Sequence, residues 1–269
     1  MTQPIDDLPE SAGSARAGRI GDDPLTLRSG RGVVPTPRAA ALAPVLARAL
    51  GELNEAVRGN DFDPAHSKRE FTLAVADVGQ LARLPRMAAL LSKEMPHTQL
   101  RVVSIDTLHA SGGLEGTLVD VAIGVGERRP GIHAEPLYDE PIVLVARVGH
   151  PRAKRRVSKA VLATLRHVEV HVSPGKPSRP LAASYAALGI TREIAVTVPT
   201  FTAAAAVVSA TDLVASLPRT LLDVFGSRLG LRAVATPLRP LTTTINILWH
   251  ERTERDPALR AFRALLKRA

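Results

Sequence analysis

Two short segments place polar groups where an expected strand gives way to an expected helix. Asp77 and Gly79 follow the apolar run at residues 71–76, and Thr200 and Phe201 follow the run at residues 194–198. The first N–H groups of a helix are unpaired and carry partial positive charge, so they bind anions such as carboxylates. Strand carboxyl ends border the ligand crevice of open α/β sheets. We therefore predict ligand contacts at these four residues, with N-capping by Asp77 and Thr200 as the simpler alternative.

Gly124 and His171 lie at the ends of two further expected strands, and we predict that they border the same crevice. Gly124 would allow close approach of the backbone, and His171 could hydrogen-bond a ligand, although a lone histidine is more often structural. The segment around Gly124 and Gly126 does not fit a phosphate-binding loop, because no Gly-Lys-Ser or Gly-Lys-Thr follows. Asp77 would repel an anion, so we expect its carboxylate to turn back onto its own helix turn. The alternative is a ligand that carries a hydrogen-bond donor at this point.

The other chemistry-bearing residues form no catalytic constellation. The eight histidines contain no His-Glu-x-x-His motif, and the close pair His167 and His171 falls on an expected strand without a carboxylate of matching geometry. The sequence has no cysteine and no Gly-x-Ser-x-Gly motif for a nucleophile elbow. We therefore expect neither an enzyme nor a metal site or cofactor.

The composition sets the broad class of the protein. The chain has 269 residues, of which 45% are hydrophobic, and a formal net charge of +9. It is long enough for a substantial core, and its basic surplus favours polyanions such as DNA. The longest apolar stretch, residues 201–217, is shorter than the roughly 20 residues of a membrane-spanning helix. No secretory signal is recognisable at the N-terminus, so we expect a cytoplasmic protein without a membrane partner.

Short β-rich runs alternate with helical patterns beyond residue 67, which predicts an α/β fold with mainly parallel sheets. The nine strands expected in this region fit two small lobes better than one continuous sheet. The expected strands are residues 71–76, 100–105, 119–125, 142–147, 168–172, 194–198, 213–216, 231–235 and 244–249. The expected helices are residues 81–95, 108–118, 178–188, 201–210, 218–225 and 257–267.

A leucine stripe precedes this region. Leu42, Leu46, Leu50 and Leu53 recur at helical spacing within residues 38–57 and place one narrow apolar face on a long helix. A stripe of this width is typical of a helix that pairs with a second helix. We therefore predict that these four leucines mediate dimerisation, and packing of the helix on its own domain remains the alternative.

Several ordered motifs resemble LysR-type transcriptional regulators. Residues 23–50 read DPLTLRSGRGVVPTPRAAALAPVLARAL and resemble the wing and linker helix of that family. Further similar segments are FDPAHSKREFTLAVAD at residues 62–77, LEGTLVDVAIGVG at residues 114–126 and VPTFTAAAAVVSATDLVASLPRTL at residues 198–221. The resemblance thus covers residues 23–269.

The resemblance implies a fold, a domain order and partners. The fold would be a two-lobed, periplasmic-binding-protein-like (type 2) effector domain, preceded by a long linker helix and the remnant of a winged helix-turn-helix. The implied parts are an unstructured lead at residues 1–22, a wing remnant at 23–37, a linker and dimerisation helix at 38–60, and an effector-binding domain at 70–269. Lobe one would comprise residues 70–141 and 240–269, and lobe two residues 142–239. The implied partners are a small organic effector in the crevice and further copies of the chain in a homodimer or homotetramer.

The resemblance also bears on DNA binding. Arg28, Arg31 and Arg38 surround the Gly-rich wing, where arginines would neutralise phosphates. Without the helices that hold a wing in place, the reading as three solvated arginines near a flexible end is preferred. The first 21 residues resemble neither the early helices nor the recognition helix of the family. We therefore expect a regulator truncated in its DNA-binding part. The alternative is a ligand-binding or dimerisation module without DNA binding of its own.

Overall fold

The computed structural model describes residues 19–20, 23–29, 32–58, 62–126, 128–172 and 178–269. The chain divides into two compact units, Met1–Asp61 and Phe62–Ala269. Among the described residues, no helix is both long enough and apolar enough to span a membrane.

The first unit begins with two short antiparallel ladders. β1 (Arg19–Ile20) pairs with β2 (Asp23–Pro24), and β3 (Thr26–Ser29) pairs with β4 (Gly32–Pro35) as a hairpin. The expectation of an unstructured lead through residue 22 is therefore wrong at residues 19–20. Strands of two residues are too short to show the alternation of apolar and polar side chains that indicates a strand in a sequence. The lead at residues 1–18 lies outside the described residues.

The long helix predicted from the leucine stripe is present as α1 (Pro37–Arg58). Its start is fixed by Thr36, whose hydroxyl accepts a hydrogen bond from the Ala39 N–H at 3.2 Å, while the Thr36 N–H donates to the Leu25 carbonyl at 3.0 Å. Pro37 fits the first turn because the N–H that proline lacks would be unpaired there. Helix α1 thus begins directly after strand β4.

The second unit contains one sheet of nine strands among the described residues. The strands are β5 (Glu70–Val75), β6 (Gln99–Val103), β7 (Val121–Gly124), β8 (Ile132–Arg147), β9 (Arg166–Val170), β10 (Glu193–Val198), β11 (Val214–Pro218), β12 (Leu231–Val234) and β13 (Leu241–His250). Their order is β10-β9-β11-β8-β13-β7-β5-β6, and β12 also pairs with β8. Each strand expected from the sequence is present, and the α/β class is confirmed.

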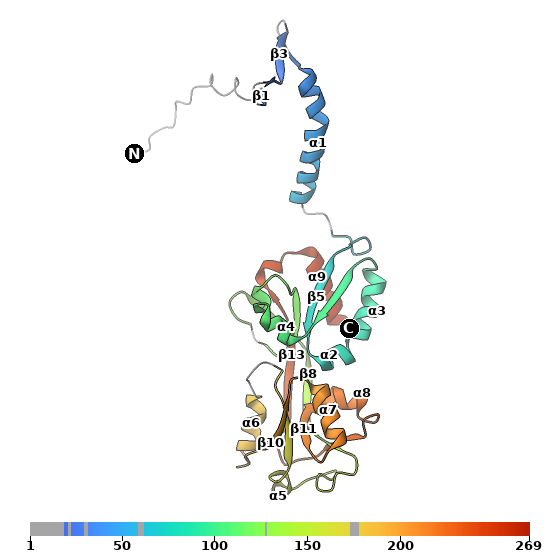
Figure 1. The fold of residues 1–269 in the computed structure, drawn as a ribbon, viewed down its shortest axis with the longest axis vertical. Helices are drawn as coiled ribbons and strands as arrows, with labels where there is room; N and C mark the ends of the chain where they lie inside the picture. The colour runs from blue at the N-terminus through green and yellow to red at the C-terminus, as the bar shows by residue number, and fades with distance from the viewer. Residues whose placement is uncertain (1–18, 21–22, 30–31, 59–61, 127, 173–177) are drawn as a thin grey trace, which may run out of the picture. The chain divides into compact units, whose positions relative to one another are not determined.

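The sheet is continuous, whereas the sequence favoured two separate sheets. β8 pairs antiparallel with β13 from Leu241 opposite Ile142 to His250 opposite Ile132, so these two strands run through both halves of the unit (Figure 1). The sequence indicated only the second part of β8, because Pro136 and Pro141 interrupt the apolar pattern and proline cannot donate to a ladder. The sheet is mixed: it is antiparallel around β8 and β13 and parallel toward its two edges.

Helices cover both faces of the sheet in each half. They are α2 (Asp77–Ala82), α3 (Leu84–Glu94), α4 (Ile105–Ala110), α5 (Lys159–Leu162), α6 (Arg179–Ala186), α7 (Phe201–Ala210), α8 (Arg219–Phe225) and α9 (Pro257–Arg268), with 3-10 helices η1 (Gly113–Glu115) and η2 (Glu251–Thr253). The first half holds β5, β6, β7, α3, α4 and α9, and the second half holds β9 to β12 and α5 to α8 (Figure 1). Each half has its own buried apolar clusters and thus its own hydrophobic core beside the shared sheet.

Two expected helices differ from those observed. The helix expected at residues 81–95 is two helices, α2 and α3, since Pro85 in the first turn of α3 lacks the N–H that would continue the preceding helix. The helix expected at residues 108–118 is the shorter α4, followed by η1. Gly112 and Gly113 lie there at φ of 86° and 72°, a left-handed conformation that ends a helix.

Candidate ligand-binding site

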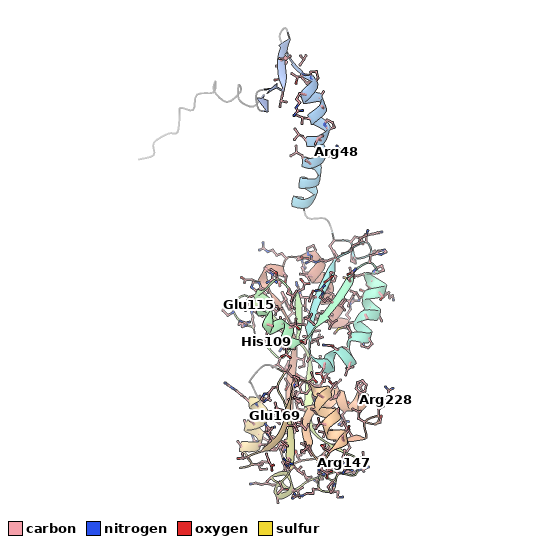
Figure 2. The ribbon with its side chains drawn as sticks, viewed as in Figure 1. Arg48, His109, Glu115, Arg147, Glu169 and Arg228 are labelled. Atoms are coloured by element: carbon pink, nitrogen blue, oxygen red, sulfur yellow. The ribbon has the colours of Figure 1, made fainter. Side chains whose placement is uncertain are left out.

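A cavity of about 750 Å³, called the central cavity here, lies where the two halves meet along β8 and β13. The first half contributes Val75, Gly79, Ile105, Leu108 and Gly124, and the second half contributes Val168, Glu169, Val170, Phe201 and Ser216. The shared strands β8 and β13 add Tyr138, Glu140, Ile142, Thr243 and Ile245. Figure 2 labels one lining residue from each half, His109 on α4 and Glu169 on β9.

The central cavity is mainly apolar and carries a few polar groups. Volumes of this size and linings of this kind are typical of sites for small organic molecules, in which the apolar surface supplies affinity and the polar groups set orientation. Among the described residues, no group of three or more metal-ligating side chains is placed to hold a metal ion. The arrangement is suited to binding a small organic molecule.

Two buried carboxylates in the lining already have partners. Glu140 accepts hydrogen bonds from the Thr220 N–H at 3.0 Å and from the Thr220 hydroxyl at 2.6 Å. Glu169 is paired with the guanidinium of Arg192, and both side chains are at least nine-tenths buried. A buried charge requires such compensation. Because these carboxylates are compensated by the protein, neither requires a cationic ligand.

Tyr138 offers a hydroxyl donor on the shared strand β8. The Arg83 guanidinium lies over its ring, 3.7 Å from the ring centroid, and is anchored by donating to the Ala269 carbonyl at 3.1 Å. Burial raises the pKa of Tyr138 above its ordinary value, although the charge of Arg83 acts in the opposite direction. The hydroxyl is therefore protonated near neutral pH and available to donate a hydrogen bond.

Three of the six residues predicted to contact a ligand line the central cavity: Gly79, Gly124 and Phe201. Gly79 is required there by packing, since a Cβ at this position would lie 2.5 Å from Cγ2 of Val75. Phe201 is the first residue of α7, so the start of that helix borders the cavity as the sequence predicts.

The other three predicted residues lie beside the cavity without lining it. The N-capping alternative is confirmed for Thr200, whose hydroxyl accepts from the Ala203 N–H at 3.2 Å. His171 is half-buried, and its backbone N–H donates to the Val198 carbonyl. Neither side chain of these two residues is part of the lining.

The expected position of the Asp77 carboxylate is wrong. It does not turn back onto its own helix but accepts a hydrogen bond from the N–H of Thr202, at 2.7 Å, in the first turn of α7. The N-cap position of α2 belongs to Ala76, and the start of α7 supplies an unpaired donor that a carboxylate stabilises. Asp77 thereby joins α2 to a helix of the second half.

Tyr138, Glu140 and Glu169 also line the cavity and were not predicted from the sequence. Glu169 leaves a local signal, a charged residue between two valines in the run HVEVHV, whereas Tyr138 and Glu140 lie in the run EPLYDEP, which has no apolar pattern. Such a residue is buried only with a partner, and its partner lies far away in the sequence: Thr220 for Glu140 and Arg192 for Glu169.

The residues predicted for dimerisation and DNA binding lie in the first unit. Leu46 and Leu50 on α1 are about half exposed, at 49% and 58%, and Leu42 is partly exposed within that unit. Arg38 is exposed at the start of α1. Arg31 and the side chains of Arg28 and Leu53 lie outside the described residues.

Solved structures of transcriptional regulators share this fold. The crystal structure of the probable transcriptional regulator PA0477 from Pseudomonas aeruginosa matches with a TM-score of 0.70 and 28% identity, over 91% of this chain and 82% of that chain. Full-length CbnR, solved with its target DNA, matches with a TM-score of 0.60 over 91% of this chain and 83% of that chain, and at 17% identity this shows the fold alone. The fold is therefore one found in transcriptional regulators.

Sequence similarity gives the family. Residues 64–269 match the LysR substrate binding domain. The activator NahR of Pseudomonas putida is 30% identical over 88% of this chain and 79% of its own length. The regulator LinR of Sphingobium indicum is 31% identical over 97% of this chain and 88% of its own length. The chain belongs to the LysR family of transcriptional regulators and carries its effector-binding domain. Both relatives are named as transcriptional regulators.

Proposed function

We propose that a small organic effector binds in the central cavity and changes how the chain controls transcription. The proposal assigns lobe one to residues 70–141 and 240–269 and lobe two to residues 142–239. The observation that carries it is a cavity of about 750 Å³ lined from both halves of the second unit. A ligand that contacts both lobes stabilises the lobe arrangement in which both sets of contacts form.

The lining favours an effector with an apolar body and one or two polar groups. Phe201, Ile105 and Val168 supply flat and aliphatic surface, while the protonated Tyr138 hydroxyl supplies a donor. Arg128 also lines the cavity and adds a positive charge, whereas the start of α7 is already paired with the Asp77 carboxylate. Small aromatic carboxylates combine these features, and they are the class that we propose.

Calorimetry with a panel of aromatic carboxylates tests the site. Truncating Phe201 to alanine removes an apolar contact that is typically equivalent to about 1.5 to 3 kcal/mol, so the affinity for the best member of the panel should fall about tenfold or more. The matched control is Phe225→Ala. Phe225 packs in the same apolar cluster as Phe201, but it does not line the cavity. Equal losses in the two variants, or none in either, would place the effector elsewhere.

We also propose that α1 joins copies of the chain into a homodimer or homotetramer. The half-exposed Leu46 and Leu50 form an apolar stripe suited to a second helix. A ligand-induced change in the lobes would then be transmitted through α1 to a neighbouring copy. As a regulator of transcription, the protein is proposed to act in the cytoplasm.

We further propose that the hairpin β3–β4 and the start of α1 contact DNA. Arg28, Arg31 and Arg38 occur in this segment, and arginines beside a hairpin neutralise backbone phosphates without reading bases. A second candidate function is a ligand-binding or dimerisation module that acts only by pairing with related chains. The effector cavity and the exposed stripe on α1 support both functions, and DNA binding distinguishes them.

A further inference from the structure

The positive charge of the chain is concentrated in the second half of the effector-binding domain. Residues 142–239 contain 14 lysines and arginines against four acidic residues. Because the whole chain carries a net charge of +9, the remaining residues are together close to neutral. The hairpin β3–β4 and α1, for which DNA contact is proposed above, lie outside this segment. The basic surplus therefore belongs to a different surface.

The acidic residues of the segment do not neutralise this surplus. Each of the four forms an ion pair with a single arginine: Glu169 with Arg192, Glu193 with Arg166, Asp212 with Arg147, and Asp223 with Arg219. No acidic residue occurs at residues 141–168. We call residues 151–159, which end at the first residue of α5, the cationic loop. Five exposed cations of this loop have no ion pair within the described part of the chain: Arg152, Lys154, Arg155, Arg156 and Lys159.

Buried anchors hold the backbone of the cationic loop in place. Ala153 and Val157 are 0% and 5% exposed and belong to an apolar cluster of the second half. The Ala153 N–H donates to Nδ1 of the buried His150 at 2.8 Å. The Ala235 N–H donates to the Arg155 carbonyl at 2.9 Å, and the Ala235 carbonyl accepts from the Val157 N–H at 3.0 Å. The loop therefore presents its cations to solvent from an ordered backbone.

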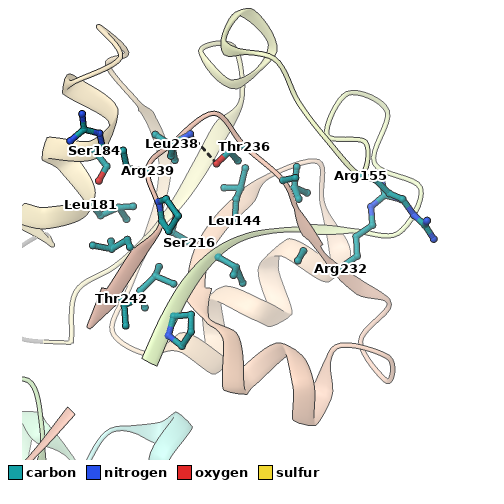
Figure 3. A pocket seen from close by; sticks show the side chains of 18 of the residues that line it. Leu144, Arg155, Leu181, Ser184, Ser216, Arg232, Thr236, Leu238, Arg239 and Thr242 are labelled. Atoms are coloured by element: carbon teal, nitrogen blue, oxygen red, sulfur yellow. Dashed lines mark hydrogen bonds between the residues drawn. The ribbon is translucent and has the colours of Figure 1, made fainter. Parts of the chain in front are cut away.

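The cationic loop lies at an open end of the domain. Helix α5, which follows it, lies at the end of the second half that faces away from the first half (Figure 1). Arg232 of β12 donates to the Ala153 carbonyl of the loop at 2.8 Å, and Figure 3 shows Arg155 beside it. The positive charge is thus accessible to a large partner.

The composition of this surface favours a nucleic acid over a protein partner. Protein interfaces are built around buried apolar or aromatic side chains. No large apolar side chain of residues 151–166 is exposed. A nucleic-acid backbone, in contrast, is bound by lysines and arginines that neutralise successive phosphates.

We propose that the cationic loop binds the phosphate backbone of DNA, as a contact separate from the hairpin β3–β4 and the start of α1. The cations gain affinity by releasing counterions from the DNA and read no bases. This contact does not depend on DNA binding by the first unit, because the loop belongs to the second unit and is anchored within it.

The salt dependence of binding to a DNA duplex of arbitrary sequence, measured by fluorescence anisotropy on the full chain, tests the proposal. The loop variant combines Lys154→Gln, Arg155→Gln and Arg156→Gln. Each lost phosphate contact removes about 0.9 from the slope of log affinity against log salt, so the slope should become less steep by about 2 to 3. The affinity at about 0.1 M salt should fall at least about tenfold.

The matched control removes the same charge from another surface. Arg86→Gln, Lys93→Gln and Arg260→Gln together change exposed side chains of α3 and α9 that form no ion pair among the described residues. This variant should keep the wild-type affinity and slope. Arg155→Lys combined with Arg156→Lys retains the charge and should also bind like the wild type. Equal losses in the two triple variants, or no loss in the loop variant, would overturn the proposal.

A third variant separates this proposal from DNA contact by the first unit. It combines Arg28→Gln, Arg31→Gln and Arg38→Gln. A loss of DNA binding in the loop variant that is retained in this background supports a separate contact at the cationic loop. If the third variant loses affinity while the loop variant binds like the wild type, contact by the first unit stands and the cationic loop is instead a surface for an acidic protein, which overturns the proposal.

Discussion

His167 is buried in β9 in a way that should make the stability of the domain depend on pH. Its side chain is 1% exposed, and neither ring nitrogen has a hydrogen-bond partner among the described residues. The Tyr185 ring packs edge-on against it, with the ring centroids 5.4 Å apart. Burial, together with the nearby charge of Arg192, lowers the pKa of His167 from 6.5 to about 4. The folded protein therefore holds this imidazole neutral.

The size of the effect follows from the difference between folded and unfolded pKa values. The folded pKa is below the unfolded one, so the unfolded chain binds more protons and the folded state loses stability as pH falls. The contribution is complete above pH 6.5 and is lost progressively down to about pH 4. A difference of roughly 2.5 units corresponds to about 3 kcal/mol in total, of which about 2 kcal/mol is lost between about pH 7.5 and about pH 5.

This pH dependence is measured by urea unfolding of the wild type and of the His167→Leu variant at about pH 7.5 and at about pH 5. The wild type should lose about 2 kcal/mol more of its free energy of unfolding than the variant on acidification, since leucine cannot bind a proton. His97→Leu is the matched control because His97 is exposed, and this variant should retain the wild-type dependence on pH. If His167→Leu lost as much stability as the wild type, His167 would not be held neutral by burial and the reasoning would be refuted.

Three further predictions concern the contact between the halves, the helix α1 and DNA. Asp77→Ala should lower the free energy of unfolding by about 0.5 to 2 kcal/mol in urea, because the Thr202 N–H loses its acceptor; an unchanged value would show that water replaces Asp77. Replacing Leu46 and Leu50 with glutamate should lower the oligomeric state in sedimentation, whereas Arg48→Glu should not if the leucine stripe is the interface. DNA binding by the chain should weaken steeply as the salt concentration rises, because its basic surplus binds phosphates by releasing counterions. An affinity that stays constant between about 50 mM and about 200 mM salt would contradict this.

The sequence determined the order and type of the elements because these depend on local patterns. Apolar runs of β-branched residues identified the strands, and leucines at helical spacing identified α1. Thr200 was recognisable as an N-cap because capping involves only residues within one turn. The positions of Gly79, Gly124 and Phe201 at strand ends also followed from this order, and all three line the central cavity.

The remaining features were decided by contacts between residues far apart in the chain. Asp77 binds the backbone of a helix start 125 positions away, and Glu140 binds Thr220, 80 positions away. No local pattern encodes which donor a buried carboxylate will find. The sequence did not indicate the strand that joins the halves, because the two prolines of β8 interrupt its apolar pattern. That stretch is kept extended by its pairing with β13. The sequence thus determined which elements form, while tertiary packing decided which side chains face the cavity and which buried charges are paired.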